Sequence, residues 1–186
     1  MLLIRALFAI FVICACLLPT TVYGQTESDN GEVAALGGVT LGAGTQPAVI
    51  ASAGIGFSKY GMGMFSIGFS PLGQSTIQPW PAHVTVDRSL LYDFGADFHL
   101  RIPVGERWAP YGIAGAGLLW NTIRQNTAAG GRHFDQFNGA LHTGAGVRFY
   151  VNKSWGIRPE VKVVVSKQIY TQLMFGFFYV TPPSWP

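Results

Sequence analysis

The sequence predicts an eight-stranded, closed, antiparallel, up-and-down transmembrane β-barrel. Three observations indicate this fold class: the chain contains eight apolar, glycine-rich segments, these segments alternate apolar and polar residues, and the connections between them are short on one side and long on the other. A barrel strand that crosses a membrane needs about ten residues and places an apolar side chain outward at every second position.

The composition of the 186-residue chain agrees with this fold class. Apolar residues make up 49% of the chain, charged residues only 11%, and there are 24 glycines. A soluble domain usually has about 25% charged residues. The formal net charge of +3 provides no basis for binding nucleic acid. These values exclude a disordered chain and argue against an ordinary soluble enzyme.

Residues 1–24 are predicted to be a signal peptide that is removed on export. They combine one basic residue, a short apolar core and small residues before the expected cleavage site, so that Gln25 begins the exported chain. Because Cys14 and Cys16 both lie in this leader, the exported chain has no cysteine for a disulfide. A lipoprotein anchored through Cys16 is the alternative, but the residues before it form a poor cleavage box. Residues 25–32 are expected to form a flexible lead-in.

Eight segments are predicted to be the strands of a barrel that covers residues 33–181. They are rich in Val, Ile, Phe and Tyr, which favour strands, and in Gly, which is common where strands curve. After the leader, no stretch approaches the roughly 18 consecutive apolar residues of a membrane-spanning helix. The predicted strands are residues 33–44, 48–58, 62–70, 89–103, 108–122, 137–151, 155–166 and 171–181, followed by a C-terminal extension at 182–186.

The lengths of the connections support the alternation of sides that a barrel requires. The two longest, residues 71–88 and 123–136, follow the third and fifth strands and therefore fall on the same side. Outer-membrane barrels have their longer loops outside the cell and short turns in the periplasm. An even number of strands also places both chain ends on the periplasmic side. The short periplasmic turns are expected at residues 59–61, 104–107 and 152–154.

Charged residues of the predicted strands fall on one face. In the seventh strand, Arg158, Glu160 and Lys162 alternate with Val161 and Val163. The same pattern in the fourth and sixth strands predicts a polar network inside the barrel, with a structural role. Its predicted members are Asp93, Asp97, His99, Arg101, His142, Arg148, Arg158, Glu160 and Lys162.

Alternation alone does not decide which face points inward. A soluble β-sandwich or lipocalin-like barrel would bury the apolar face instead. The leader, the low charge and the aromatic residues near strand ends favour the membrane orientation, because aromatic belts suit a membrane interface. The aromatic residues expected at the periplasmic rim are Trp108, Tyr111, Phe149, Tyr150, Trp155 and Tyr179, and those at the outer rim are Phe69, Tyr92, Trp120, Phe137 and Tyr170.

An eight-stranded barrel is just wide enough for side chains to fill, which argues against an open diffusion pore. Its buried carboxylates need basic partners. A hairpin centred on Ser154 would place Arg148 directly opposite Glu160, and we therefore expect this ion pair.

The candidate residues form no evident catalytic or metal site. Asp93 and Asp97 lie about 13 Å apart along a strand, whereas the two carboxylates of a glycosidase are about 5 to 9.5 Å apart. No second cluster completes a metal site, and no cofactor is expected. In the connection 71–88, Trp80 stands between two prolines, where it either contacts a partner or packs over the barrel rim.

Three stretches resemble the second half of small bacterial outer-membrane β-barrels of the OmpA/OmpX kind. They are residues 110–117, 144–150 and 156–162, and an Arg158-Pro159-Glu160 element is similar in that family. The resemblance implies an eight-stranded barrel in the outer membrane of a Gram-negative-type cell. It also implies contact with outer-membrane lipid and lipopolysaccharide, and with the barrel assembly machinery during insertion. The chain differs from the family after Tyr179, because a typical member ends on the aromatic residue of its last strand.

The function expected from these observations is non-enzymatic. The barrel would serve envelope integrity or surface interaction through its outer loops, with a surface partner that the sequence does not identify. One alternative is a lipid-modifying enzyme resembling lipid-A deacylases, although no predicted strand has their His-x-Ser arrangement. The other is a soluble periplasmic barrel that binds a small apolar ligand.

Overall fold

The computed structural model describes residues 31–181, except 43, 73–74, 78–83, 105–106 and 128–129. The predicted signal peptide, Trp80 and the C-terminal extension lie outside the described residues, as does most of the predicted lead-in. Within the described part, no helix is long and apolar enough to cross a membrane.

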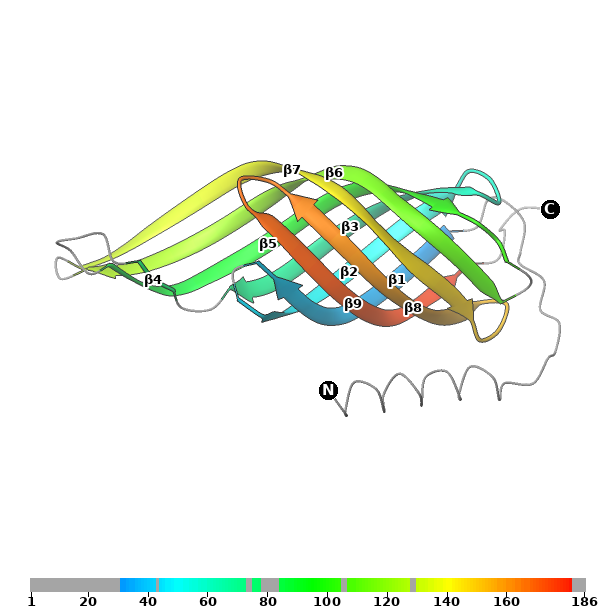
Figure 1. Ribbon diagram of the computed structural model, residues 1–186, viewed down its shortest axis with the longest axis horizontal. Helices are drawn as coiled ribbons and strands as arrows, with labels where there is room; N and C mark the ends of the chain where they lie inside the picture. The colour runs from blue at the N-terminus through cyan, green and yellow to red at the C-terminus, as the bar shows by residue number, and fades with distance from the viewer. Residues whose placement is uncertain are drawn as a thin grey trace.

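The described residues form one antiparallel sheet that closes into a barrel (Figure 1). The sheet order is β3-β2-β1-β9-β8-β7-β6-β5-β4, and pairing of β3 with β5 closes it, so that β4 lies outside the closure. The predicted eight-stranded closed antiparallel barrel is therefore confirmed. The strands are β1 (Gly31–Leu41), β2 (Gln46–Gly56), β3 (Gly61–Leu72), β4 (Ser75–Ile77), β5 (Val84–Arg101), β6 (Trp108–Thr127), β7 (Gly130–Tyr150), β8 (Trp155–Val165) and β9 (Ile169–Val180).

Both ends of the described chain lie at the same end of the barrel, as an even strand number requires. Glu32 of β1 pairs with Val180 of β9, and the Thr181 amide donates a 2.8 Å hydrogen bond to the Gly31 carbonyl. The connections after β2, β5 and β7 lie at this end too, which we call the turn end. The opposite end is called the arm end.

The two connections expected to be long loops consist largely of strand, so that part of the prediction is wrong. β6 and β7 pair without interruption as far as Thr127 and Gly130, whereas β8 extends only to Val165, opposite Leu141. Beyond the barrel the strands need no apolar outer face, so their polar sequence is hard to tell from a loop. We call β4 with residues 84–88, 124–127 and 130–134 the arm; Figure 1 shows β5, β6 and β7 continuing past the other strands.

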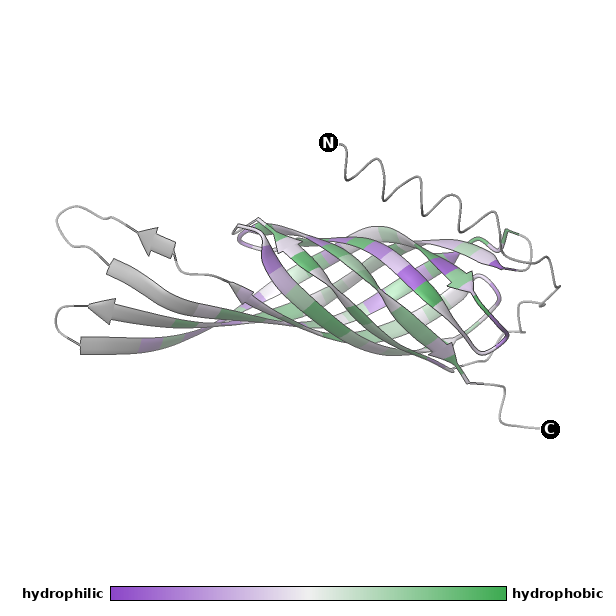
Figure 2. Ribbon diagram, turned by 90° about the horizontal axis from the view of Figure 1, so that it is seen from below, coloured by the Kyte–Doolittle hydropathy of each residue, from purple (hydrophilic) through white to green (hydrophobic). Residues whose placement is uncertain are grey.

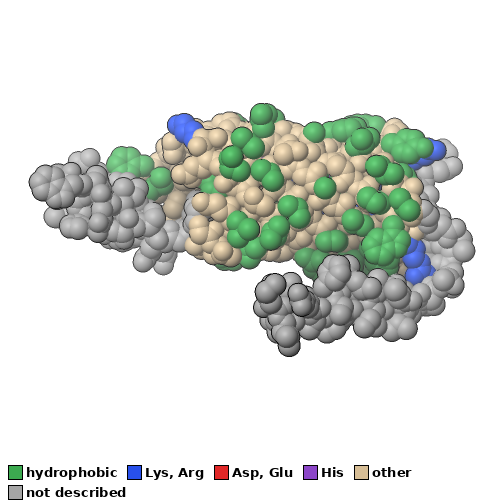
Figure 3. All heavy atoms as spheres, in the orientation of Figure 1, with side chains coloured by type: hydrophobic (Ala, Val, Ile, Leu, Met, Phe, Trp, Pro, Cys, Tyr) green, Lys and Arg blue, Asp and Glu red, His purple; other side chains and the backbone are tan. Residues whose placement is uncertain are grey.

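Apolar side chains face outward and charged ones face the interior. Val161 and Phe98 are both 45% exposed, whereas Arg158 and Asp97 are 2% and 7% exposed. Hydrophobic and hydrophilic residues alternate along the barrel strands in Figure 2, and on the face shown in Figure 3 basic side chains appear only near the ends. The direction of alternation predicted for a membrane barrel is confirmed.

Pro159 interrupts one ladder of the barrel. The pairing of β7 with β8 skips from Gly146–Glu160 to Phe149–Ile157. Proline has no N–H to donate, so a gap opposite it is expected. The side chains on either side of Pro159 still point into the lumen, where they form the site described next.

Candidate functional site

Charged side chains in the lumen form two clusters. The first ionic cluster, toward the turn end, consists of Glu32, His99, Tyr111, Arg148, Arg158 and Glu160. The second ionic cluster consists of Asp93, Asp97, His142 and Lys162. A layer of buried apolar side chains lies on the arm side of both and is made of Leu91, Leu119, Ala140, Val164 and Tyr170.

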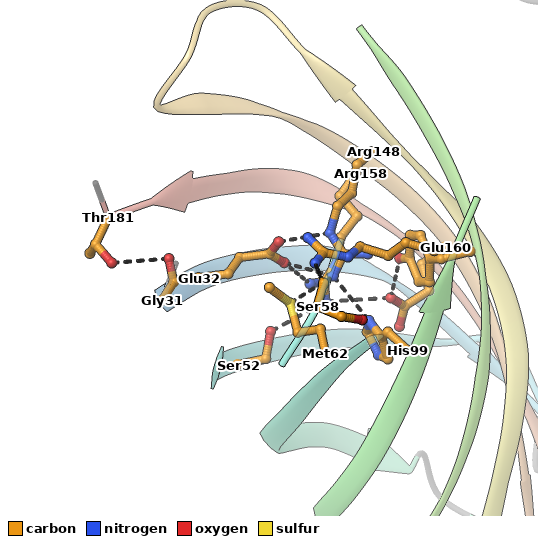
Figure 4. Close-up of polar contacts among 12 residues, drawn as sticks. Gly31, Glu32, Ser52, Ser58, Met62, His99, Arg148, Arg158, Glu160 and Thr181 are labelled. Carbon is orange, nitrogen blue, oxygen red and sulfur yellow. Dashed lines mark hydrogen bonds and ion pairs between the residues drawn. The ribbon is translucent and has the colours of Figure 1, made fainter. Parts of the chain in front are cut away.

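Glu32 is the centre of the first ionic cluster (Figure 4). Arg148 donates to both of its carboxylate oxygens, from Nε at 2.7 Å and from Nη2 at 3.0 Å. Arg158 donates to the same carboxylate from Nη1 at 2.9 Å. The side chains of Glu32 and Arg148 have no solvent exposure. A fork of two parallel hydrogen bonds is a strong and geometrically specific arrangement of a carboxylate with arginine, so these three side chains are held firmly together in the lumen.

The predicted ion pair between Arg148 and Glu160 is not formed. The hairpin is centred on Lys153 rather than Ser154, and Glu160 pairs with Gly146. Glu160 instead accepts a 2.6 Å hydrogen bond from the Tyr111 hydroxyl and lies 3.4 Å from Arg158 Nη2. A two-residue error in register keeps every side chain on its correct face but changes its neighbours.

Glu32 is absent from the network predicted from sequence because the first strand was expected to begin at Val33. β1 begins at Gly31, and Glu32 continues the inward-facing series of Ala34 and Leu36. Extending the alternation by one residue would have placed this carboxylate in the lumen. The omission matters, since Glu32 is the acidic partner of both buried arginines.

His142 and Lys162 join the two aspartates of the second ionic cluster. His142 Nδ1 lies 2.7 Å from Asp97 Oδ1, and Nε2 lies 3.3 Å from Asp93 Oδ1. Lys162 Nζ lies 3.3 Å from Asp93 and 3.8 Å from Asp97. Only the Nδ1 contact is a hydrogen bond, since Nε2 and both Asp93 carboxylate oxygens have no hydrogen-bond partner among the described residues. Arg148, Arg158, Lys162 and the His142 ring are the basic groups that lie against the four carboxylates of the two clusters.

Three glycines make room for the His142 ring and its partner. A Cβ at Gly95 or Gly117 would lie 2.8 or 2.7 Å from His142 Cε1, and a Cβ at Gly115 would overlap the Asp97 carboxylate. These contacts are too short for real carbon atoms. A side chain at any of these positions would displace the His142 ring or the Asp97 carboxylate.

The other predicted network residues lie nearer the turn end. His99 stacks on Tyr111 with ring centroids 4.8 Å apart and contacts Arg148 Nη2 through Nδ1 at 3.0 Å. Arg101 donates a 2.7 Å hydrogen bond to the Ser58 carbonyl. It forms no ion pair with a carboxylate among the described residues, so it belongs to neither ionic cluster.

The aromatic belts were predicted only in part. Tyr111, Phe149 and Tyr170 are buried instead of lying exposed at a rim. Tyr111 and Tyr170 point into the lumen, and Phe149 packs against the Trp108 ring. At the arm end, Phe69, Tyr92, Trp120 and Phe137 stand directly opposite one another on β3, β5, β6 and β7. Their rings follow each other at 5.3, 5.1 and 5.7 Å. We call this row the aromatic ladder.

The described residues include no group of three or more His, Cys, Asp or Glu side chains able to hold a metal ion. The Lys162 ammonium lies within 4 Å of both Asp93 and Asp97 and supplies positive charge between them. The chemistry of the lumen is therefore that of a closed, ion-paired interior.

No protein-family model matches the sequence, and no curated protein matches it. Solved structures do match. The attachment invasion locus protein Ail of Yersinia pestis is 12% identical over 84% of this chain and 99% of its own, with a TM-score of 0.55. Ail has also been solved in complex with the heparin analogue sucrose octasulfate.

Two further matches belong to other bacteria. The N-terminal β-barrel domain of Pseudomonas aeruginosa OprF is 16% identical over 84% of this chain and all of that domain, with a TM-score of 0.55. A major outer membrane protein of Thermus thermophilus is 8% identical over 83% of this chain and all of its own, with a TM-score of 0.62. At these identities the likeness establishes the fold, which is that of small outer-membrane β-barrels.

Proposed function

We propose that the chain is a non-enzymatic outer-membrane β-barrel with a closed interior, and that it displays its arm outside the cell for surface interaction. The observation that carries the proposal is the continuation of β5, β6 and β7 past the end of the barrel. A barrel that only sealed the membrane would need no such extension. Loops and extensions at one end of a rigid scaffold are common places for binding.

The wall of the barrel supports the membrane location. The exposed large side chains of the closed sheet are mainly apolar, and the lumen holds most of the described strand charges. A soluble periplasmic barrel with an apolar ligand in its middle would need the reverse arrangement. The lumen is instead filled by large buried side chains such as Arg148, Arg158 and Phe178.

Along β7, the arm and the adjoining residues have a strand edge that pairs with no other described strand, apart from a hydrogen bond that the Ser166 hydroxyl donates to the Gly139 carbonyl. Residues 130–140 of β7 extend beyond the last pair with β8, which is Leu141–Val165. At about 3.3 Å per residue this edge is roughly 35 Å long. An exposed edge presents backbone donors and acceptors to which an extended segment of another protein can add.

The lipid-modifying enzyme is the weaker hypothesis. Such an enzyme must present its catalytic side chains to lipid on the outer wall. His99 and His142 are 2% and 3% exposed and point into the lumen, where both have partners.

Fractionation tests the location. On expression in a Gram-negative host, we expect the chain in the outer-membrane fraction, with a folded band on gels that changes mobility after heating. Recovery in the soluble periplasm would overturn the proposal.

A pair of photo-crosslinking residues tests the role of the arm. One replaces Phe134, which is 44% exposed beyond the barrel, and the control replaces the exposed Thr143 on the outer wall of the same strand. On intact cells we expect Phe134 to give adducts with protein or glycan and Thr143 to give adducts with lipid. If both positions give lipid alone, the arm lies in the bilayer and surface interaction is excluded. If Phe134 gives the same protein or glycan adducts after residues 125–132 are replaced by a tight turn, the end of the arm is not needed for surface interaction, which would also contradict the proposal.

A further inference from the structure

The lumen opens at the arm end into a small cup. Its volume is about 250 Å³. The cup is separate from both ionic clusters, and its lining includes Gln136 and Asn138 from the strand edge of β7. Its lining residues are Leu91, Leu119, Asn121, Ile123, Gln136, Asn138, Ser166, Lys167, Gln168 and Tyr170.

The floor of the cup is apolar and closed. Leu91, Leu119 and Tyr170 are 3%, 3% and 6% exposed and belong to the apolar layer above the second ionic cluster. The cup is therefore a dead end and not the mouth of a channel. A bound molecule would rest one face on this floor.

The wall of the cup consists mainly of side-chain amides. Asn121 on β6 stands directly opposite Gln136 on β7, and Asn138 stands opposite Leu119 of the floor. Asn121 Oδ1 accepts a 2.6 Å hydrogen bond from Ser89, and Gln168 Oε1 accepts a 2.8 Å hydrogen bond from Tyr170. These two bonds hold the amides in place and leave their NH₂ groups as donors.

The remaining two amides keep all their hydrogen-bonding capacity. No hydrogen bond joins the side chain of Gln136 or Asn138 to another described residue. Each primary amide offers two N–H donors and one carbonyl acceptor. Together the four amides present both donors and acceptors to the same small space.

This chemistry selects a class of ligand. A hydroxyl group both donates and accepts, so several hydroxyls match a set of amides better than an anion or a cation does. Among the residues whose side chains the structure describes, no carboxylate lines the cup and Lys167 is the only charged side chain in its lining. The volume equals that of about eight liquid water molecules, which suits one six-membered ring.

We propose that the cup binds one neutral sugar ring, with its C–H face on the apolar floor and its hydroxyls on the amides of Asn121, Gln136, Asn138 and Gln168. The proposed outward orientation of the arm end would expose the cup to sugars outside the cell. Binding itself does not depend on that orientation and can be measured on the purified barrel.

The test uses isotope-labelled barrel in micelles of an amine-oxide detergent, since maltoside headgroups would compete. Methyl α-D-glucopyranoside is added while the side-chain NH₂ signals are followed by NMR. We expect saturable shifts of the Asn121, Gln136 and Asn138 signals. Asn121→Leu combined with Asn138→Leu should weaken the apparent affinity at least about tenfold.

Two further variants keep the result interpretable. Thr143→Val makes a comparable polar-to-apolar change on the outer wall and should bind as the parent does. Asn138→Ser is the milder cup variant if the double variant does not refold. Shifts that do not saturate, or saturable shifts that the cup variants leave unchanged, would overturn the proposal.

The sugar could be free or could belong to lipopolysaccharide. Barrels in phospholipid nanodiscs with and without lipopolysaccharide separate these sources. Shifts of the cup amides on adding lipopolysaccharide identify its saccharide as the occupant, and shifts with methyl glucoside alone identify a free sugar. If neither produces a shift, the proposal is wrong, while the surface location tested by fractionation would still stand.

Discussion

Both ionic clusters of the lumen pair buried carboxylates with basic side chains, but they use different basic residues and different geometry. In the first, one carboxylate, Glu32, receives three hydrogen bonds from Arg148 and Arg158 at 2.7 to 3.0 Å. In the second, two carboxylates share Lys162 and His142, and only one of those four contacts is shorter than 3.3 Å. Arginine offers a planar fork that matches a carboxylate, whereas lysine is a point charge.

This difference indicates that ion pairs of the first cluster contribute more to the stability of the barrel than those of the second. The first cluster is geometrically tight and should depend strongly on each member. The second is looser and depends on space that glycines provide, so it should tolerate the loss of one charge better. Each prediction below is measured as the free energy of unfolding in urea, with the heat-modifiable gel band as the readout of the folded state.

The largest effect is expected for Glu32→Gln. The change leaves Arg148 and Arg158 buried without their carboxylate, and breaking a buried ion pair costs about 3 to 5 kcal/mol. Glu160→Gln is the matched control. It should cost clearly less, because the Tyr111 hydroxyl can donate to an amide oxygen and Arg158 lies 3.4 Å away. Equal losses would show that Glu32 is not the centre of the cluster.

The second largest effect is expected for Lys162→Met. Asp93 and Asp97 would then share His142 alone, and we expect a loss of about 2 to 3 kcal/mol. Because the side chain of Met fills similar space, the loss reports charge more than packing. A loss greater than that of Glu32→Gln would reverse the order of the two clusters.

A smaller effect is expected for Arg148→Lys. The variant keeps the positive charge but loses the fork on Glu32 and the position of the guanidinium 4.3 Å from the Tyr111 ring centroid. We expect a loss of about 2 kcal/mol. No loss would mean that charge alone, without geometry, stabilises the first cluster.

The smallest effect is expected for Gly95→Ala. Its Cβ would meet Ser66 Oγ at 2.6 Å and His142 Cε1 at 2.8 Å, both side-chain atoms that can shift. We expect a loss of about 1 to 2 kcal/mol. Gly112→Ala is the control on β6, since a Cβ there meets nothing within 4 Å. That control should be neutral or slightly stabilising, and the same loss at both positions would assign the effect to the strand backbone.

In the arm, the alternation of apolar and polar residues no longer predicts where the strands continue. Residues 123–127 and 130–136 were expected to form a loop because they are polar and contain glycine. They pair nevertheless, since a hairpin already started in the barrel can continue its backbone hydrogen bonds with any side chains that tolerate a strand. An apolar face is required only where the strand borders lipid or core.

Period-two alternation in the sequence by itself determined which side chains of a strand share a face, while the leader, the low charge and the aromatic residues favoured the charged face as the inner one. This holds because neighbouring side chains on a strand point to opposite sides, whatever the strand pairs with. Which side chains meet was decided only by the tertiary structure. Arg148 and Glu32 are 116 residues apart, and their contact depends on the closure of the sheet and on the register of several hairpins. A shift of two residues in one hairpin leaves every local pattern intact and replaces the partner of every buried charge it carries.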